Sequence, residues 1–594
     1  MRRFVFGLFT AIGFMTVLAA ALVGILTWRL AASGPTLPYT IVLTADLSQG
    51  LAKGAGPDPL SQLVFGGEQT LRDFLDALER AGDDPRVKGL YARLGEDKLG
   101  LATCQEARDA IRDFRAKGKF AIVFTDGFGE FGPGTRPYYL ATAFDEIWLQ
   151  PLGSVGLIGL HADLPFFRGA LDRLGILPSF AHREQYKSAM NTLTETAMTA
   201  PQREEVEDLL RATSGQIVSG IAGTRKLSEA GVALLIDRGP FVADEAKAAG
   251  LVDRIGYRDE AIAKAKERAG AGAELVSLTR YLDGAGHPHD KGATIALIYA
   301  TGLVTKGGGS STPLIDSAVV SAREVGKAFR QAFGDPEVRA ILFRIDSPGG
   351  SAVGSETIWR EVVRAREHGK PVIVSMGEVA GSGGYYIAAP ADKIVAEPAT
   401  LTGSIGVLAG KLVVAELLHK LGITDDSAQT GANAAMFSAF ADFSPAARER
   451  LDTFLDAVYR GFKEHVAAGR HLTDEQVEAA AKGRVWSGED AKEKGLVDEL
   501  GGYGVALRLA REAAKIPEDK PFKLVVFPRR KNPLELAYDR LFDVERDSDE
   551  ASPAATHGIA AQGMAAGLAD VLSGIATLTG HPGVLRMPPI GEVR

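Results

Sequence analysis

Short apolar runs alternate with amphipathic stretches along most of this chain. In the second half, residues 294–299, 340–345 and 372–375 have the β-branched, apolar composition of buried strands. Between them, residues 318–333 and 355–367 place their apolar positions at helical spacing. Strands that alternate with helices in this way are typical of βαβ units. The pattern therefore predicts an α/β fold with parallel sheets and flanking helices.

Two longer helices are predicted farther along, one in each half of the chain. The first begins near Pro201 and the second near Pro445, and acidic residues follow both prolines closely. Proline suits the first turn of a helix because an amide hydrogen there would have no partner within the helix. Acidic side chains favour the same end of a helix.

Four motifs recur in the same order in the two halves, at a nearly constant separation. The matched segments are Asp84–Leu94 with Asp335–Ile345, Pro137–Ala141 with Gly384–Ala388, Gly153–Gly156 with Gly403–Gly406, and Gly250–Asp253 with Gly495–Asp498. Agreement of both order and spacing indicates an internal duplication. A chain of 594 residues is also too long for a single hydrophobic core.

The duplication suggests a division into domains. We expect an N-terminal repeat over residues 38–275 and a C-terminal repeat over residues 290–520. The stretch 270–292 is rich in Gly and Ala, and we interpret it as the connector. The extension 521–594 is expected to be partly flexible.

The N-terminal segment, residues 1–34, predicts a membrane anchor. The run from Phe4 to Trp28 carries no charge and is long enough for a hydrocarbon core of about 30 Å. Arg2 and Arg3 favour the cytoplasmic side, which would put the body of the protein on the other side of the membrane. A cleaved signal peptide is the alternative, because residues 30–33 include small side chains suited to cleavage.

Composition narrows the classes of function. A net charge of −8 gives no reason to expect nucleic acid as a partner. Cys104 is the single cysteine, which excludes an internal disulfide and a metal site built from cysteines. The ten histidines include no HExxH motif. We predict neither a metal nor any other cofactor.

The segment 379–386 places Ser382 among glycines, between a strand-like run and a helix-like run. Glycines let the backbone approach closely, and a hydroxyl near a helix N-terminus lies where negative charge is favoured. The alternative is an ordinary turn in which the serine caps the helix. Opposite Ser382 the first half has Thr135, followed by Arg136 and Pro137 in place of glycines. The nucleophile-type turn is therefore present in one repeat only.

The first half has a different candidate, Lys187, and the aligned position in the second half is Ala434. A solvated surface lysine is the alternative interpretation. Because each repeat lacks what the other offers, we expect Ser382 and Lys187 to form one site. Lysine can activate a serine only when it is neutral, so burial must lower its pKa from about 10.4. The expected apolar walls are Tyr186, Met190, Tyr385 and Tyr386.

Taken together, these features resemble the long, duplicated form of bacterial signal peptide peptidase, a membrane-anchored serine peptidase. The motifs that carry the resemblance are Asp346–Gly350, Ser382–Tyr386, Leu401–Gly406 and Tyr186–Ser188. The resemblance covers residues 40 to 515 and the N-terminal anchor. It implies two tandem domains of the Clp protease/crotonase fold, with parallel sheets, after one transmembrane helix.

The resemblance also implies roles and partners. Ser382 would be the nucleophile, Lys187 the general base, and the backbone of Gly349 and Gly350 the oxyanion site. Remnant signal peptides and other short apolar peptides would be the substrates. The protein would be a homotetramer in a bacterial inner membrane, with its catalytic body on the periplasmic side.

Two other functions are compatible with such a fold: a crotonase-like acyl-CoA enzyme and a catalytically silent membrane scaffold. Neither would need the pair of Ser382 and Lys187. Four weaker candidates accompany that pair. Ser404 and Ser154 occupy the same place in both repeats, which favours a structural turn; Ser188 could bond Lys187 or be a surface residue; and Asp346 is expected to cap the turn after it.

Overall fold

The computed structural model describes residues 35–54, 69–307, 319–529, 584–586 and 592–593. Within those ranges no helix has the length and apolar character needed to cross a bilayer. The expected anchor, residues 4–28, lies outside the described residues, as does most of the 521–594 extension.

The first repeat is built on a six-stranded sheet whose strands are all parallel. Its order is β10 (Glu274–Ser277), β1 (Ile41–Asp46), β2 (Val87–Leu94), β3 (Phe120–Thr125), β4 (Glu146–Leu149) and β9 (Arg254–Ile255). Helices α3 (Leu71–Gly82), α4 (Leu101–Ala116) and α12 (Leu278–Ala285) pack with it in one apolar core, and α11 (Arg258–Ala269) packs in another. The predicted α/β fold with parallel sheets is confirmed.

The second repeat has a sheet with the same order. From one edge it runs β22 (Phe522–Phe527), β11 (Ala293–Thr301), β14 (Val338–Ser347), β16 (Val372–Gly381), β17 (Lys393–Ala396) and β21 (Glu499–Leu500), all parallel. The C-terminal end of β16 also pairs with β18 (Leu401–Gly403), which pairs antiparallel with β20 (Val485–Ser487). In the first repeat β5 (Ser154–Val155) and β8 (Phe241–Val242) form the matching antiparallel pair. This agreement is what the internal duplication predicts.

The interpretation of residues 270–292 as a connector is wrong over much of its length. Residues 274–277 form β10, and residues 278–285 form α12. Leu278, Tyr281 and Leu282 of that helix are buried in the first core. The abundance of Gly and Ala hid a short amphipathic helix with three large apolar positions.

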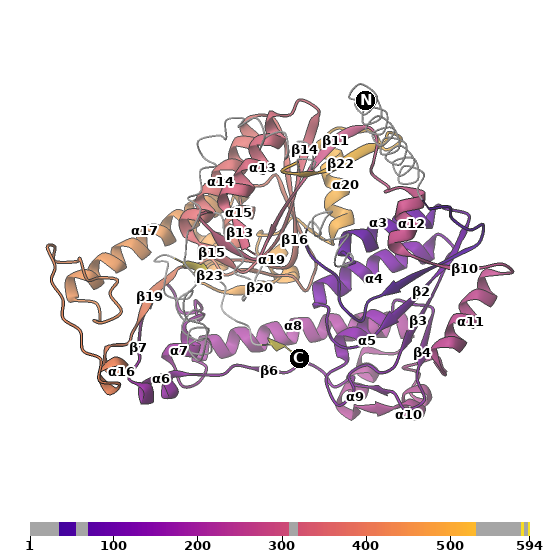
Figure 1. The fold of residues 1–594 in the computed structure, drawn as a ribbon, viewed down its shortest axis with the longest axis horizontal. Helices are drawn as coiled ribbons and strands as arrows, with labels where there is room; N and C mark the ends of the chain where they lie inside the picture. The colour runs from indigo at the N-terminus through magenta and orange to yellow at the C-terminus, as the bar shows by residue number, and fades with distance from the viewer. Residues whose placement is uncertain (1–34, 55–68, 308–318, 530–583, 587–591, 594) are drawn as a thin grey trace, which may run out of the picture.

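The two long predicted helices are present and begin where expected. Helix α8 spans Ala200–Arg225, and helix α17 spans Pro445–Arg470. Thr199 and Ser444 cap them by accepting hydrogen bonds from backbone amides of the first turn. Figure 1 shows α8 running from the first repeat beneath the second, where it reaches β20.

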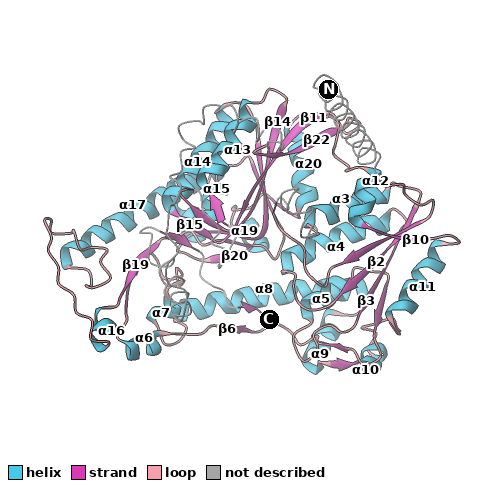
Figure 2. Cartoon of the chain, in the orientation of Figure 1, coloured by secondary structure: helices cyan, strands magenta, loops and turns pink. Residues whose placement is uncertain are grey.

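A third sheet joins the repeats. Its order is β13 (Val319–Ser321), β12 (Leu303–Thr305), β15 (Gly349–Ser351), β23 (Val584–Arg586), β19 (Leu408–Val413) and β7 (Leu177–His182). Strand β7 belongs to the first repeat and pairs antiparallel with β19 of the second. In Figures 1 and 2, β7 and α6 (Arg168–Leu174) accordingly lie beside β19 and α16 (Ala415–Lys420), far from the first sheet.

Shorter elements complete the described chain. They are α5 (Thr135–Ala141), β6 (Ala162–Asp163), α7 (Asn191–Thr194), α9 (Glu229–Arg238), α10 (Ala243–Ala248), α13 (Ala322–Gly334), α14 (Ala352–Glu367), α15 (Gly383–Ala388), α18 (Asp474–Ala480), α19 (Gly488–Glu493), α20 (Tyr503–Ala513) and β24 (Glu592–Val593). Helices α13 and α14 correspond to the predicted stretches 318–333 and 355–367.

Candidate active site

Ser382 lies at the sharp turn between β16 and α15. Its φ of 54° and ψ of −114° are unusual for a residue other than glycine. Its amide donates to the Gly403 carbonyl at 2.8 Å, and its carbonyl accepts from the Tyr386 amide at 2.8 Å. Its side chain makes no capping hydrogen bond to α15, so the interpretation as a capping serine is wrong. A strained backbone of this kind costs about 1–3 kcal/mol and is typical of functional sites.

Lys187 follows β7, and the pairing of β7 with β19 brings it to Ser382. The distance between Lys187 Nζ and Ser382 Oγ is 2.8 Å, within one chain. The same nitrogen lies 2.9 Å from both the carbonyl oxygen and the hydroxyl oxygen of Ser404. Lys187, Ser382 and Ser404 have no exposed surface. The alternative of a solvated surface lysine is therefore wrong.

The environment of Lys187 favours its neutral form. Burial lowers the pKa of the amine well below its usual range, and the charge of Glu205 opposes that shift. Among the described residues, no carboxylate lies within ion-pair distance of Lys187 to stabilise an ammonium. A buried amine without a counterion is more easily deprotonated than an ordinary lysine.

The backbone of two glycines lies close against Lys187. A Cβ added to Gly483 would lie 2.6 Å from the Lys187 nitrogen of the main chain, and one added to Gly406 would lie 3.1 Å from Lys187 Cδ. The expected tyrosines are bonded elsewhere. The Tyr186 hydroxyl donates to Glu204, the Tyr385 hydroxyl to the Leu496 carbonyl, and the Tyr386 hydroxyl to Glu356. A side chain at Gly483 or Gly406 would therefore crowd Lys187.

Sequence reasoning missed Ser404. Its occurrence in both repeats suggested a shared structural turn, but Ser404 contacts Lys187 through both oxygens. The counterpart Ser154 lies in β5, whose partner is β8. No sequence signal separated Ser404 from Ser154, because its contact with Lys187 depends on what the fold brings to it.

Two other minor expectations need correction. Ser188 is buried, and its hydroxyl has no hydrogen-bond partner among the described residues, so it neither bonds Lys187 nor lies at the surface. Asp346 does not cap the turn after it. Its carboxylate accepts from the Val379 amide at 3.3 Å and pairs with Lys53 at 3.1 Å. Asp346 therefore braces β16 shortly before Ser382.

Gly349 and Gly350 lie beside the turn that carries Ser382. A Cβ added to Gly383 would be 3.1 Å from both Gly349 Cα and the Gly350 nitrogen. Gly349 and Gly350 have φ values of 100° and 150°, which other residues rarely adopt. The Gly349 amide donates to Ser347 Oγ over a long distance of 3.2 Å. The geometry thus places two glycine amides next to the first turn of α15.

The described part of the first repeat has no equivalent centre. Thr135 begins α5, and its hydroxyl donates to the Gly159 carbonyl at 3.0 Å. Ala434, which aligns with Lys187, is exposed in a loop of the second repeat. The described residues therefore bring a serine and a lysine together once, with each repeat supplying one of them.

The slot alongside the glycines, between β15 and β19, is occupied by strand β23. Strand β23 runs antiparallel to β15, with Gly349 opposite Arg586 and Gly350 opposite Leu585. On its other side Val584 pairs with Leu408 of β19. An extended segment can therefore hydrogen-bond between β15 and β19, next to the turn that carries Ser382.

The sequence pattern of peptidase family S49 matches residues 131–272 and 364–517. The chain is also 32% identical over 468 residues to Protease 4 of Salmonella typhi, covering 76% of this chain and 73% of that protein. The chain belongs to peptidase family S49. It is 31% identical over 477 residues to the chloroplastic serine protease SPPA of Arabidopsis thaliana, covering 78% of this chain and 69% of that protein. This S49 member is a serine peptidase.

Solved structures add little to this assignment. A point mutant of ClpP1 from Listeria monocytogenes aligns over 36% of this S49 peptidase and 94% of its own chain, at 15% identity and a TM-score of 0.23. That score is too low to compare the two folds.

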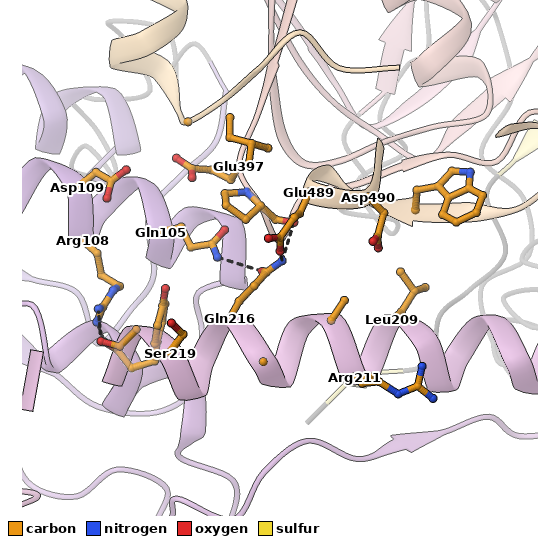
Figure 3. A pocket seen from close by; sticks show the side chains of 18 of the residues that line it. Gln105, Arg108, Asp109, Leu209, Arg211, Gln216, Ser219, Glu397, Glu489 and Asp490 are labelled. Carbon is orange, nitrogen blue, oxygen red and sulfur yellow. Dashed lines mark hydrogen bonds between the residues drawn. The ribbon is translucent and has the colours of Figure 1, made fainter. Parts of the chain in front are cut away.

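A cavity of about 1080 Å³ lies between the repeats of the S49 peptidase, along α8 (Figure 3). Gln105 and Gln216 bridge part of it with a hydrogen bond of 3.2 Å. Arg484 and Val485 line it, whereas Ser382 and Lys187 do not. The cavity is therefore separate from the buried pair and borders the backbone that covers Lys187.

Proposed function

We propose that this S49 peptidase is a membrane-tethered endopeptidase that cleaves short apolar peptides, with Ser382 as nucleophile and Lys187 as general base. The observation that carries the proposal is the 2.8 Å contact between a fully buried amine and a strained serine. A serine hydroxyl is a weak nucleophile until a base accepts its proton.

The three contacts of Lys187 Nζ suit a neutral amine. A neutral amine has two hydrogens and one lone pair. With the hydrogens donated to the carbonyl and hydroxyl oxygens of Ser404, the lone pair faces Ser382 Oγ. Lys187 would accept the Ser382 proton as Oγ attacks the scissile carbonyl, and then donate it to the leaving amine. A water molecule activated by the same amine would hydrolyse the acyl-enzyme.

The backbone next to Ser382 suits the rest of the reaction. In our proposal the amides of Gly349 and Gly350 stabilise the oxyanion, which is worth about 2.7–4 kcal/mol per donor. The long bond from the Gly349 amide to Ser347 Oγ would give way to the stronger acceptor. An extended substrate would displace β23 from the slot between β15 and β19 and take over its strand pairing.

The expected location decides which peptides reach the site. The uncharged run 4–28 would anchor the protein in a bacterial inner membrane, with the catalytic body on the periplasmic side. Remnant signal peptides are short and apolar and are released at that membrane, so we propose them as substrates. We also propose a homotetramer, which the resemblance to signal peptide peptidases implies.

The test is labelling of the active-site serine by a fluorophosphonate together with hydrolysis of an apolar peptide. We expect the wild type to be labelled and Ser382→Ala to be neither labelled nor active. Lys187→Ala should lose most of its activity, because general base catalysis is worth about 10²–10⁴ in rate. Thr135→Ala is the matched control in the other repeat and should retain full activity.

Three results would contradict the proposal. Labelling of Ser382→Ala would mean that another serine is the nucleophile. Near-normal turnover by a folded Lys187→Ala variant would exclude the lysine as the base. A large loss of activity in Thr135→Ala would indicate a second site in the first repeat.

A further inference from the structure

The turn that covers Lys187 is made of residues 482–485, which follow α18 and end at the first residue of β20. The Lys482 carbonyl accepts from the Tyr186 amide at 3.2 Å, and the Arg484 carbonyl accepts from the Ser404 amide at 2.7 Å. Through these two bonds the covering turn fixes the residue before Lys187 and the residue that contacts its amine. A displacement of this turn would change the position of Lys187 Nζ relative to Ser382.

Helix α8 of the first repeat holds the covering turn from outside. Glu205 Oε1 accepts a hydrogen bond from the Val485 amide at 2.6 Å. Arg484, the preceding residue, forms ion pairs with Glu204 and Asp208 of the same helix. Of the three acidic residues only Glu205 is buried, with 2% of its surface exposed. The contact with the Val485 amide is therefore shielded from water and direct.

The covering turn borders the cavity between the repeats. Arg484 and Val485 line the 1080 Å³ cavity, and Leu209 of α8 lies on the same cavity (Figure 3). The Val485 side chain packs against Leu209 in a small apolar cluster, and β20 pairs with β18. The polar contacts with α8 add to this packing and strand pairing, and they tie the covering turn to the first repeat.

Glu205 also interacts electrostatically with the site. Burial is the main cause that raises the pKa of its carboxyl to about 8, and the charge of Glu204 adds to it. The Val485 amide, Arg484 and Lys187 act in the opposite direction and lower that pKa. An ionised Glu205 in turn raises the pKa of Lys187. A protonated Glu205 therefore favours the neutral amine, and a carboxylate opposes it.

We propose that Glu205 is a positioning residue of the catalytic site: it holds the covering turn over Lys187 through the Val485 amide, and its charge controls how readily Lys187 releases its proton. The inference rests on the proposed pair of Ser382 and Lys187. Helix α8 thus contributes to the site although it contains neither residue.

The test compares Glu205→Gln, Glu205→Ala and the control Glu207→Gln by kcat and KM across the neutral and alkaline range. Glu207 lies on the same helix with 58% of its side chain exposed. In Glu205→Gln the amide oxygen can still accept from Val485, so kcat on the plateau should stay within about threefold of the wild type. In the plot of kcat against pH, the rising limb of this variant should move to lower pH. The reason is that Gln cannot form the carboxylate that raises the pKa of Lys187.

Glu205→Ala removes the acceptor, and we expect its kcat to fall by about tenfold or more, because small displacements of catalytic groups are costly. KM should change little, since Glu205 does not contact the slot between β15 and β19. If Glu205→Ala does not fold, the pH profile of Glu205→Gln still tests whether the charge of Glu205 acts on Lys187. A pH profile of Glu205→Gln identical to that of the wild type would overturn the inference. So would a folded Glu205→Ala variant with the kcat of the wild type.

Fluorophosphonate labelling separates this inference from the proposed function. If the wild type is not labelled, or if Lys187→Ala is labelled as fast as the wild type, the pair itself fails. If labelling depends on Ser382 and Lys187 while both Glu205 variants match Glu207→Gln, only the role of Glu205 fails.

Discussion

Glu378 Oε1 accepts a hydrogen bond from the Thr103 amide at 2.6 Å, across the boundary between the two repeats. Glu378 lies on β16 shortly before Ser382, and its second oxygen accepts from the Ala102 amide at 3.2 Å. Gly100, at the start of α4, makes no side-chain cap. The second repeat therefore caps a helix of the first, and the strand leading to Ser382 is fixed in the process.

This cap can be tested by removing its acceptor. We expect Glu378→Ala to lower the free energy of unfolding by about 1–2 kcal/mol, because two amides of α4 lose their partner. Glu378→Gln keeps one oxygen acceptor and should lose less. Chemical denaturation followed by circular dichroism measures both. Glu96→Ala, at a side chain 81% exposed, is the control. Equal stability of Glu378→Ala and the control would show that the cap contributes nothing.

The close wall of Lys187 leads to a second prediction. Gly483 has a φ of +78°, and a Cβ there would lie 2.6 Å from the Lys187 main-chain nitrogen. Gly422 has the same φ, but a Cβ there would have no neighbour within 4 Å. Both substitutions to Ala add similar backbone strain, about 1 kcal/mol.

We therefore expect Gly422→Ala to keep its activity and Gly483→Ala to lose most of it, because only the second displaces Lys187. Peptide hydrolysis at equal concentrations of folded enzyme measures the difference. A Gly483→Ala enzyme as active as Gly422→Ala would mean that the covering turn moves aside without consequence.

The buried amine predicts how stability changes with pH. Burial places the pKa of Lys187 below the unfolded value of about 10.4, so between those two values the unfolded chain binds one more proton than the folded chain. The free energy of unfolding then rises with pH across that window. Below the folded pKa the destabilisation is complete and constant.

The Lys187→Met variant has no amine at this position, so its stability does not depend on the titration of residue 187. Relative to this variant, the wild type should gain up to about 1.4 kcal/mol per pH unit as pH rises within the window. Denaturant unfolding of both proteins at matched pH values gives the difference. Parallel curves for the two proteins would show that Lys187 is protonated in the folded state.

Local patterns were enough to predict the α/β class, several strands and helices of the second repeat and the two long helices. Helices α8 and α17 begin at the predicted prolines because their caps are local, and the repeated motifs predicted two sheets of the same order. The connector was misjudged because α12 gains its stability from burial of Leu278, Tyr281 and Leu282 against the first sheet. Such burial is invisible in a Gly- and Ala-rich sequence.

Comparison of the two repeats within the sequence identified Ser382 and Lys187, because each occurs in one copy only. It could not identify Ser404, because the first repeat has a serine, Ser154, at the same place. The two serines differ in their neighbours, since the fold brings Lys187 to Ser404. The pairing of β7 with β19 across the repeats delivers Lys187 to Ser404 and Ser382. The walls of glycine backbone around the amine, and the contact between Glu205 and Val485, depend on the same long-range assembly. Sequence by itself determined the fold class, the duplication and the two candidate side chains, since these depend on local pattern and composition. Tertiary structure alone decided the burial and the partners of the amine, because residues distant in the chain create both.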